Sequence, residues 1–149
     1  MLRKVKTLFK LDWRTKWLMI ETFLLCGLVR ALILLIPFKK FRPYLGTHNA
    51  DSRQEEEISV YRQAREIGRT VAIVSRHTPW ESKCLVQAMV AQYLLKRRKI
   101  ATTLYLGVAK GSEGELKAHA WLRCGQMIVT GDGARRDYKE VARFANLAA

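Results

Sequence analysis

The sequence is poor in cysteine and proline, with three of each among its 149 residues. Cys26, Cys84 and Cys124 leave one unpaired thiol and lie far apart, which excludes a disulfide framework and a zinc site with short CxxC spacing. The scarcity of proline and an apolar content of 49% exclude a disordered chain. We therefore expect one compact domain with a small appendage, in the reducing environment of the cytoplasm.

Acidic residues are also few, 13 against 27 Lys and Arg, which gives a formal net charge of +14. This charge attracts nucleic acid, anionic lipid and acidic peptides alike. Nucleic-acid-binding proteins usually interleave aromatic residues and glycines with their basic residues, and the basic cluster at 96–99 lacks both. We expect no nucleic-acid partner.

The segment from Trp17 to Phe38 is almost entirely apolar, and no small-residue cleavage site of the A-x-A kind follows it. Basic residues flank it on both sides: Arg3, Lys4, Lys6, Lys10, Arg14, Lys16, Lys39, Lys40 and Arg42. Glu21 and Arg30 interrupt it on opposite sides of a helix, so we expect no uninterrupted lipid-facing surface. Three alternatives stay open: a helix buried against protein, an interfacial helix that contacts an anionic bilayer through residues 1–45, and a membrane span.

A turn-rich stretch at 43–52 separates an N-terminal helical region, residues 1–50, from a second region, residues 51–149. In the second region, apolar residues recur every three to four positions over 58–74, which predicts an amphipathic helix. A capping pattern at Thr78 or Ser82 predicts the start of a further helix, which is apolar on nearly all sides over 85–95. Cys84 then lies in the first or second turn of a buried helix. The helix N-terminus stabilises a thiolate there, so Cys84 is a candidate nucleophile.

Three strands are predicted after this helix, over 101–109, 117–123 and 126–130, the first with one buried face. The second alternates, with His119 and Trp121 on one face and Ala120 and Leu122 on the other. If the sheet is antiparallel and packs on the helix, His119 lies beside the helix N-terminus and Asp132 follows the neighbouring strand. Cys84, His119 and Asp132 are the three parts of a cysteine-nucleophile triad. The fold class is therefore α+β.

Three motifs together resemble a known family: W-x(3)-C-L-V-Q-A-x(4)-Y-L-L-K-R-R-K-I at 80–100, T-L-Y-L-G-V at 103–108 and A-H-A-W-L at 118–122. They resemble the transglutaminase-like leader peptidases of bacterial lasso peptide biosynthesis, in the stand-alone form without a fused leader-recognition domain. The resemblance implies N-terminal helices followed by a transglutaminase-like, papain-like core. It also implies a cysteine protease that cuts a ribosomally made precursor between leader and core and needs no cofactor or metal.

The resemblance further implies the residue roles and the partners. Cys84 matches the nucleophile, His119 the general base and later the acid, and Asp132 the aspartate that orients the imidazole; Asp137 is an alternative for that last role. The partners are the precursor peptide, a small leader-recognition protein that captures the leader by strand addition, and an ATP-dependent cyclase that takes the released core.

Three alternatives remain at the level of the sequence. The same triad serves acyl transfer to an amine in place of hydrolysis. A non-catalytic adaptor keeps the fold and docks partners at the inner face of the membrane. A zinc site built from Cys84, His119 and Cys124 lacks the short ligand spacings of known sites.

Overall fold

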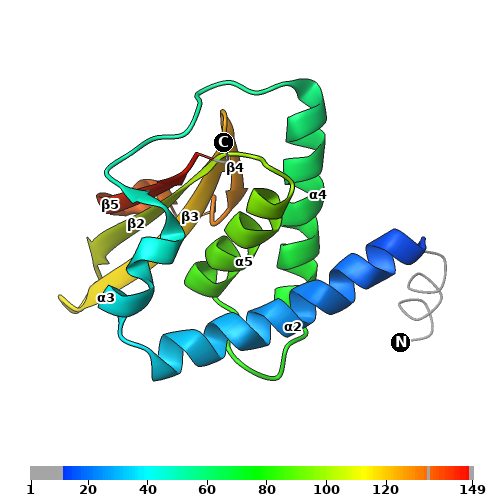
Figure 1. Cartoon of the computed structure of the whole chain (residues 1–149). Helices are drawn as coiled ribbons and strands as arrows, with labels where there is room; N and C mark the ends of the chain where they lie inside the picture. Colours follow the sequence, from blue (N-terminus) through cyan, green and yellow to red (C-terminus); the bar gives the residue numbers. More distant parts are fainter. Residues whose placement is uncertain (1–11, 134, 148–149) are drawn as a thin grey trace.

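The computed structural model describes residues 12–133 and 135–147, and in this part of the chain it contains four α-helices and one five-stranded antiparallel sheet (Figure 1). The predicted α+β class is confirmed. The helices are α2 (Trp13–Leu35), α3 (Phe38–Phe41), α4 (Ile58–Ser75) and α5 (Cys84–Arg97). The strands are β1 (Thr47–His48), β2 (Thr102–Lys110), β3 (Leu116–Cys124), β4 (Met127–Thr130) and β5 (Lys139–Asn146), and two short 3-10 helices are η1 (Arg42–Leu45) and η2 (Arg135–Asp137).

The sheet has the strand order β1-β5-β2-β3-β4, and α4 and α5 cover one of its faces. The apolar side chains of alternate strand positions, among them Leu104, Ala120 and Leu122, pack against these helices in one hydrophobic core. Residues from both predicted regions belong to this core, because Leu18 and Leu45 contribute to it as well. The three predicted strands are confirmed with small shifts of their ends.

The sequence did not reveal β5, which inserts between β1 and β2. Its sequence, KEVARFAN, is short and contains three charged residues, so its alternation is weak. Phe144, which is 1% exposed, is the only large side chain that β5 places in the core. The pairing of β5 with β2, rather than local preference, makes this segment a strand.

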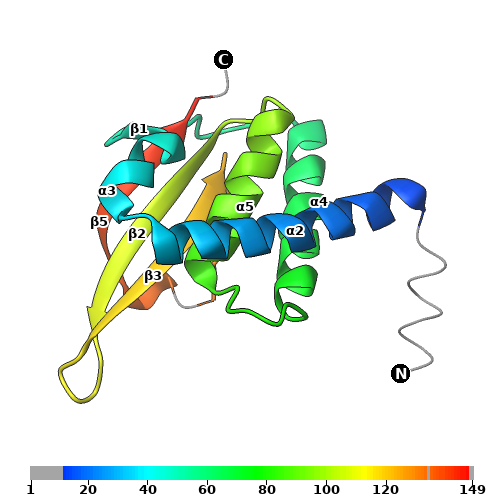
Figure 2. The same cartoon turned by 60° about the horizontal axis from the view of Figure 1, so that its bottom comes forward.

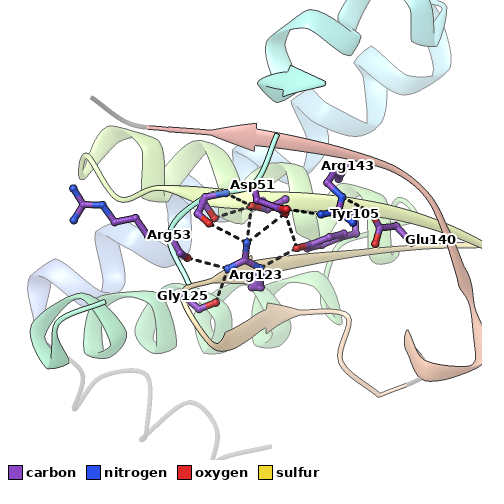
Figure 3. A network of polar contacts seen from close by, with 9 residues as sticks. Asp51, Arg53, Tyr105, Arg123, Gly125, Glu140 and Arg143 are labelled. Carbon is purple, nitrogen blue, oxygen red and sulfur yellow. Dashed lines mark hydrogen bonds and ion pairs between the residues drawn. The ribbon is translucent and has the colours of Figure 1, made fainter. Parts of the chain in front are cut away.

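The second face of the sheet is covered as well, so the prediction of a single buried face for the strand at 101–109 is wrong. Thr103 is fully buried and Tyr105 is 9% exposed, although both alternate with the core residues. The connection before α4 lies over them, since the Ser52 and Thr103 hydroxyl oxygens are 2.7 Å apart. Arg123, on the same face, binds the backbone of this connection (Figure 3).

Helix α2 forms an outer layer and lies across α5 and α4 (Figure 2). It begins after Asp12, whose carboxylate accepts a hydrogen bond from the Thr15 backbone N–H at 3.0 Å, and it ends before Pro37. Only its inner side is buried, at Leu18, Thr22 and Cys26. The basic flank that precedes the apolar segment in the sequence lies partly outside the described residues, at Arg3, Lys4, Lys6 and Lys10.

The two charged residues that interrupt the apolar part of α2, Glu21 and Arg30, both pair with other parts of the domain. Glu21 forms an ion pair with Arg97 at the end of α5, and Arg30 forms one with Glu81, three residues before α5, at 3.2 Å. These pairs lie at the flanks of the helix and leave an exposed apolar stripe between them. The expectation that Glu21 and Arg30 remove any uninterrupted apolar surface is therefore wrong.

Helix α5 begins at Cys84, so both predicted starts, at 78 and at 82, are wrong. The Thr78 hydroxyl lies 2.9 Å from the Trp80 carbonyl oxygen and 2.8 Å from the Ser82 hydroxyl. Both capping candidates therefore form hydrogen bonds within the loop itself. The residue before the helix, Lys83, provides no side-chain cap. The prediction that Cys84 lies in the first turns is confirmed, since it is the first residue of α5.

Candidate active site

The chain direction brings the predicted residues to one end of the domain. Helix α5 turns directly into β2, which runs back along it, and β2 pairs antiparallel with β3, so α5 and β3 run in the same direction (Figure 1). The beginning of α5 and the beginning of β3 therefore lie at the same end. Strand β4 is antiparallel to β3, so its C-terminal end arrives there too. This end holds Cys84, His119 and the Gly131–Asp132 turn.

His119 lies where the covered part of β3 begins. Residues 116–118 are exposed, His119 is half-buried, and residues 120–124 are buried. The imidazole is on the face opposite Ala120 and Leu122, as the alternation predicts. It lies between two aromatic rings, with centroid distances of 5.8 Å to Trp121 and 5.0 Å to Tyr138. These contacts limit the orientations that the ring adopts.

One hydrogen bond fixes the orientation of the His119 ring. Its Nε2 lies 2.7 Å from the backbone carbonyl oxygen of Gly131. A carbonyl oxygen only accepts, so Nε2 carries the proton and donates it. In the neutral ring, Nδ1 is then the nitrogen with an available lone pair. The contact thus selects the tautomer in which Nδ1 is the base.

Cys84 differs from the other two cysteines in its surroundings. It is half-buried, whereas Cys26 and Cys124 are fully buried. Burial raises the pKa of the Cys26 thiol, and burial followed by the nearby Glu56 carboxylate raises the pKa of Cys124 to about 11. Both buried thiols are therefore poor nucleophiles at neutral pH. Cys84 packs against the core on the face of the sheet that α5 covers, whereas the His119 ring lies on the opposite face, and the thiol and the ring form no hydrogen bond with each other in the described structure.

Neither of the two candidate aspartates forms a hydrogen bond with His119 in the described part of the chain. Asp132 is exposed, and its carboxylate accepts a hydrogen bond from Arg135 Nε at 2.8 Å. Asp137 is the last residue of η2 and is also exposed. The contact that orients His119 comes from the carbonyl of the residue before Asp132. The catalytic role of Asp132, like that of the whole triad, stays a prediction.

Helix α2 holds the loop that leads into Cys84. The Trp80 ring packs on α2 with a centroid distance of 5.0 Å to the Phe23 ring, and it lies so close to Gly27 that an added Cβ would be 2.9 Å from it. Burial raises the pKa of the Cys26 thiol on the inner side of α2, and the neighbouring Ser82 side chain in this loop lowers it. Together with the pair between Arg30 and Glu81, these contacts fix the approach to the first turn of α5.

Several of these residues were not predicted as part of the site. Trp121 had a signal in the sequence, because it lies two positions after His119 on the same strand face. The sequence signal for Gly131 was weaker, because Gly131 was marked only as the neighbour of Asp132. The group that contacts His119 is its backbone carbonyl, which every residue type has. Tyr138 had none, since its place beside His119 depends on how the chain returns after β4.

A metal site does not form among the described residues. No group of three His, Cys, Asp or Glu side chains there gathers closely enough to hold an ion. The zinc site considered from the sequence needs His119 and Cys124 together. Cys124 lies on the core face of β3 and His119 on the opposite face, so the strand separates them.

Comparison with known proteins agrees with this architecture, in which a cysteine begins a core helix and a histidine lies on the adjoining antiparallel sheet. A family model described as the transglutaminase-like superfamily matches residues 32–143. The chain belongs to this superfamily, whose activities are of the cysteine protease and acyltransferase type. Neither the search of curated proteins nor the search of solved structures found a match.

Proposed function

We propose that this protein is a cysteine peptidase that removes the leader from a ribosomally made lasso precursor peptide. The observation that carries the proposal is the position of Cys84. It is the first residue of the core helix, it is half-buried, and it lies at the same end of the domain as His119. The N-terminal N–H groups of α5 favour a thiolate and a developing oxyanion at this point.

The orientation of His119 supports its role as the base. The proposed reaction requires the thiol and the ring to meet around the end of β3, because Cys84 packs on the core side of the sheet and His119 lies on the other side. With Nε2 donating to the Gly131 carbonyl, Nδ1 is then the nitrogen that accepts the proton of the Cys84 thiol. The thiolate then attacks the last carbonyl carbon of the leader. The backbone N–H of Cys84 is the proposed donor to the oxyanion. The imidazolium returns its proton to the amine of the core peptide as the C–N bond breaks, which leaves a thioester on Cys84.

Water completes the cycle. His119 takes a proton from the water molecule that attacks the thioester, the C–S bond breaks, and the leader departs as a free acid. Asp132 is proposed to support the imidazole from the turn that also carries the Gly131 carbonyl. This step requires its carboxylate to leave Arg135, and Asp137 is the alternative.

The proposed partners follow from the reaction. A separate leader-recognition protein presents the precursor, and an ATP-dependent cyclase receives the core. We place the reaction in the cytoplasm.

The test is co-expression of the full chain with a lasso precursor and a leader-recognition protein, read by mass spectrometry. We expect free leader acid with the native chain and none with Cys84→Ala, whose helix content stays unchanged. Cys124→Ala is the matched control, since it removes a thiol on the core face of β3 that neither the mechanism nor the approach to α5 uses. Cleavage by Cys84→Ala would remove this residue as the nucleophile.

The same experiment separates hydrolysis from acyl transfer, because a transferase yields a new amide in place of the acid. A second measurement tests the pair itself. If His119 and Cys84 act together, His119→Ala changes the pH profile of Cys84 alkylation. An unchanged profile would separate the two residues and leave the fold without its proposed base.

A further inference from the structure

The outward face of α2 carries an apolar stripe that nothing in the described part of the chain covers. Its large members are 53–81% exposed. The stripe consists of Trp13, Trp17, Ile20, Leu24, Leu28, Ala31 and Leu35. At about 100° per residue, all seven lie within about 40° of one line along the helix. This line is about 34 Å long. Extended exposed apolar surfaces of this kind mark sites of interaction with a protein or a membrane.

Charge surrounds this stripe but does not enter it. Arg14 is exposed beside its first turn, and Lys39, Lys40 and Arg42 are exposed just beyond its last. The first fifty residues contain ten Lys and Arg against two acidic residues, Asp12 and Glu21. Glu21 lies at the flank and is neutralised by Arg97. The face is therefore apolar along its length and positive at both ends.

By length and composition α2 could cross a membrane. Its contacts favour a different arrangement, because its inner side is docked along the domain. Leu18, Thr22 and Cys26 are buried there, and ion pairs fix the helix near both ends of α5. A spanning helix would break these contacts and place Glu21 and Arg30 in hydrocarbon. A docked helix exposes only its outer face.

We propose that α2 lies in the plane of an anionic lipid bilayer, with the stripe in the interface and the rest of the domain on the aqueous side. The apolar residues enter the boundary of headgroups and acyl chains, and Trp13 and Trp17 occupy the depth that tryptophan prefers. The basic residues at both ends attract anionic headgroups. The only polar groups of the stripe are the indole N–H groups of Trp13 and Trp17, which suit the boundary of headgroups and acyl chains, and this favours lipid as the occupant.

The proposal predicts binding of the full chain to vesicles. We expect co-sedimentation with phosphatidylcholine vesicles that contain phosphatidylglycerol, and much weaker binding to phosphatidylcholine alone. High salt releases an in-plane helix that is held partly by charge, whereas a spanning helix stays bound. Release by salt therefore supports the proposal, and retention in salt together with equal binding to both lipids overturns it.

Variants on the stripe provide the control. Leu24→Gln with Leu28→Gln removes two side chains that are each 64% exposed, so it leaves the fold intact and lowers partition roughly tenfold to a hundredfold. Ile58→Gln with Ile73→Gln, at exposed positions of α4, is the matched pair and leaves partition unchanged. Equal loss in both pairs, or none in either, overturns the proposal.

Sedimentation velocity without lipid tests a protein occupant. A monomer supports the proposal. A dimer that Leu24→Gln with Leu28→Gln dissociates assigns the stripe to a second copy of the chain and overturns it. None of these measurements depends on peptidase activity, so their outcome is independent of the proposed reaction.

Discussion

Replacement of Arg123 by Ala should destabilise the domain far more than any single surface charge would. Arg123 is 8% exposed, and its guanidinium lies 3.6 Å from the Asp51 carboxylate (Figure 3). It donates hydrogen bonds of 2.7–3.2 Å to five oxygens, those of the Tyr105 and Thr103 hydroxyls and of the Ser52, Arg53 and Gly125 carbonyls. Together these contacts hold the segment before α4 on the sheet.

The magnitude follows from what the substitution leaves behind. A buried acceptor without a partner costs about 1–3 kcal/mol, and loss of one member of a buried charged network costs about 3–5 kcal/mol. Asp51 keeps its second partner, Arg143, so the cost falls near the lower end of that range. We expect Arg123→Ala to lower the free energy of unfolding by about 3 kcal/mol. Arg123→Lys recovers little, because one ammonium group does not reach five acceptors.

The assay is urea unfolding of the full chain followed by tryptophan fluorescence, with the m-value compared between variants. Arg143→Ala is the control, because its side chain is 34% exposed and its pairs with Asp51 and Glu140 lie at the surface. Arg143→Ala should lower the free energy of unfolding by less than about 1 kcal/mol. A loss for Arg123→Ala no larger than that for Arg143→Ala would refute the reasoning.

Three further predictions concern the thiols and the turn at 131. Alkylation near neutral pH should modify Cys84 before Cys26 and Cys124, as read by peptide mass spectrometry, and equal slow rates at all three would favour the adaptor. Burial raises the pKa of the Cys124 thiol from 9.0 to about 11. The contribution of the neutral thiol to stability is therefore complete below about pH 9 and is lost as the pH rises towards 11. Over that range the decline in the free energy of unfolding should be shallower in Cys124→Ala than in the native chain. Gly131→Ala should lower the free energy of unfolding by about 1–3 kcal/mol and should also lower precursor cleavage, because φ is 78° and an added Cβ would lie 2.4 Å from the Ala120 carbonyl oxygen. Gly133→Ala, where an added Cβ meets nothing within 4 Å, should change neither the unfolding free energy nor the cleavage.

The helices and the first strands were predictable because their signals are local. The alternation around His119 placed Ala120 and Leu122 on the core side and the imidazole on the other, and the structure agrees. The three- to four-residue spacing over 58–74 gave α4 nearly to the residue. The start of α5 was misplaced, since Thr78 and Ser82 carry capping side chains but bond within their own loop.

Nonlocal contacts decided the rest of the candidate site. The Gly131 carbonyl accepts a hydrogen bond from His119, whereas the family resemblance gives the orienting role to the carboxylate of Asp132, which stays a prediction. A backbone carbonyl carries no sequence signature, and only the pairing of β3 with β4 brings it to the ring. Tyr138 reaches the opposite side of the ring for the same reason, through the path of the chain after β4.

The sequence by itself determined the fold class, the alternation of side chains around His119 and the candidacy of Cys84, because each depends on the period of apolar residues or on a chain position within a few turns. Only the tertiary structure decided which side of α2 faces water and which group holds His119. Both depend on contacts between segments far apart in the chain. For α2 the difference is physical: its composition is apolar on nearly all sides, and docking on α4 and α5 covers only one of them.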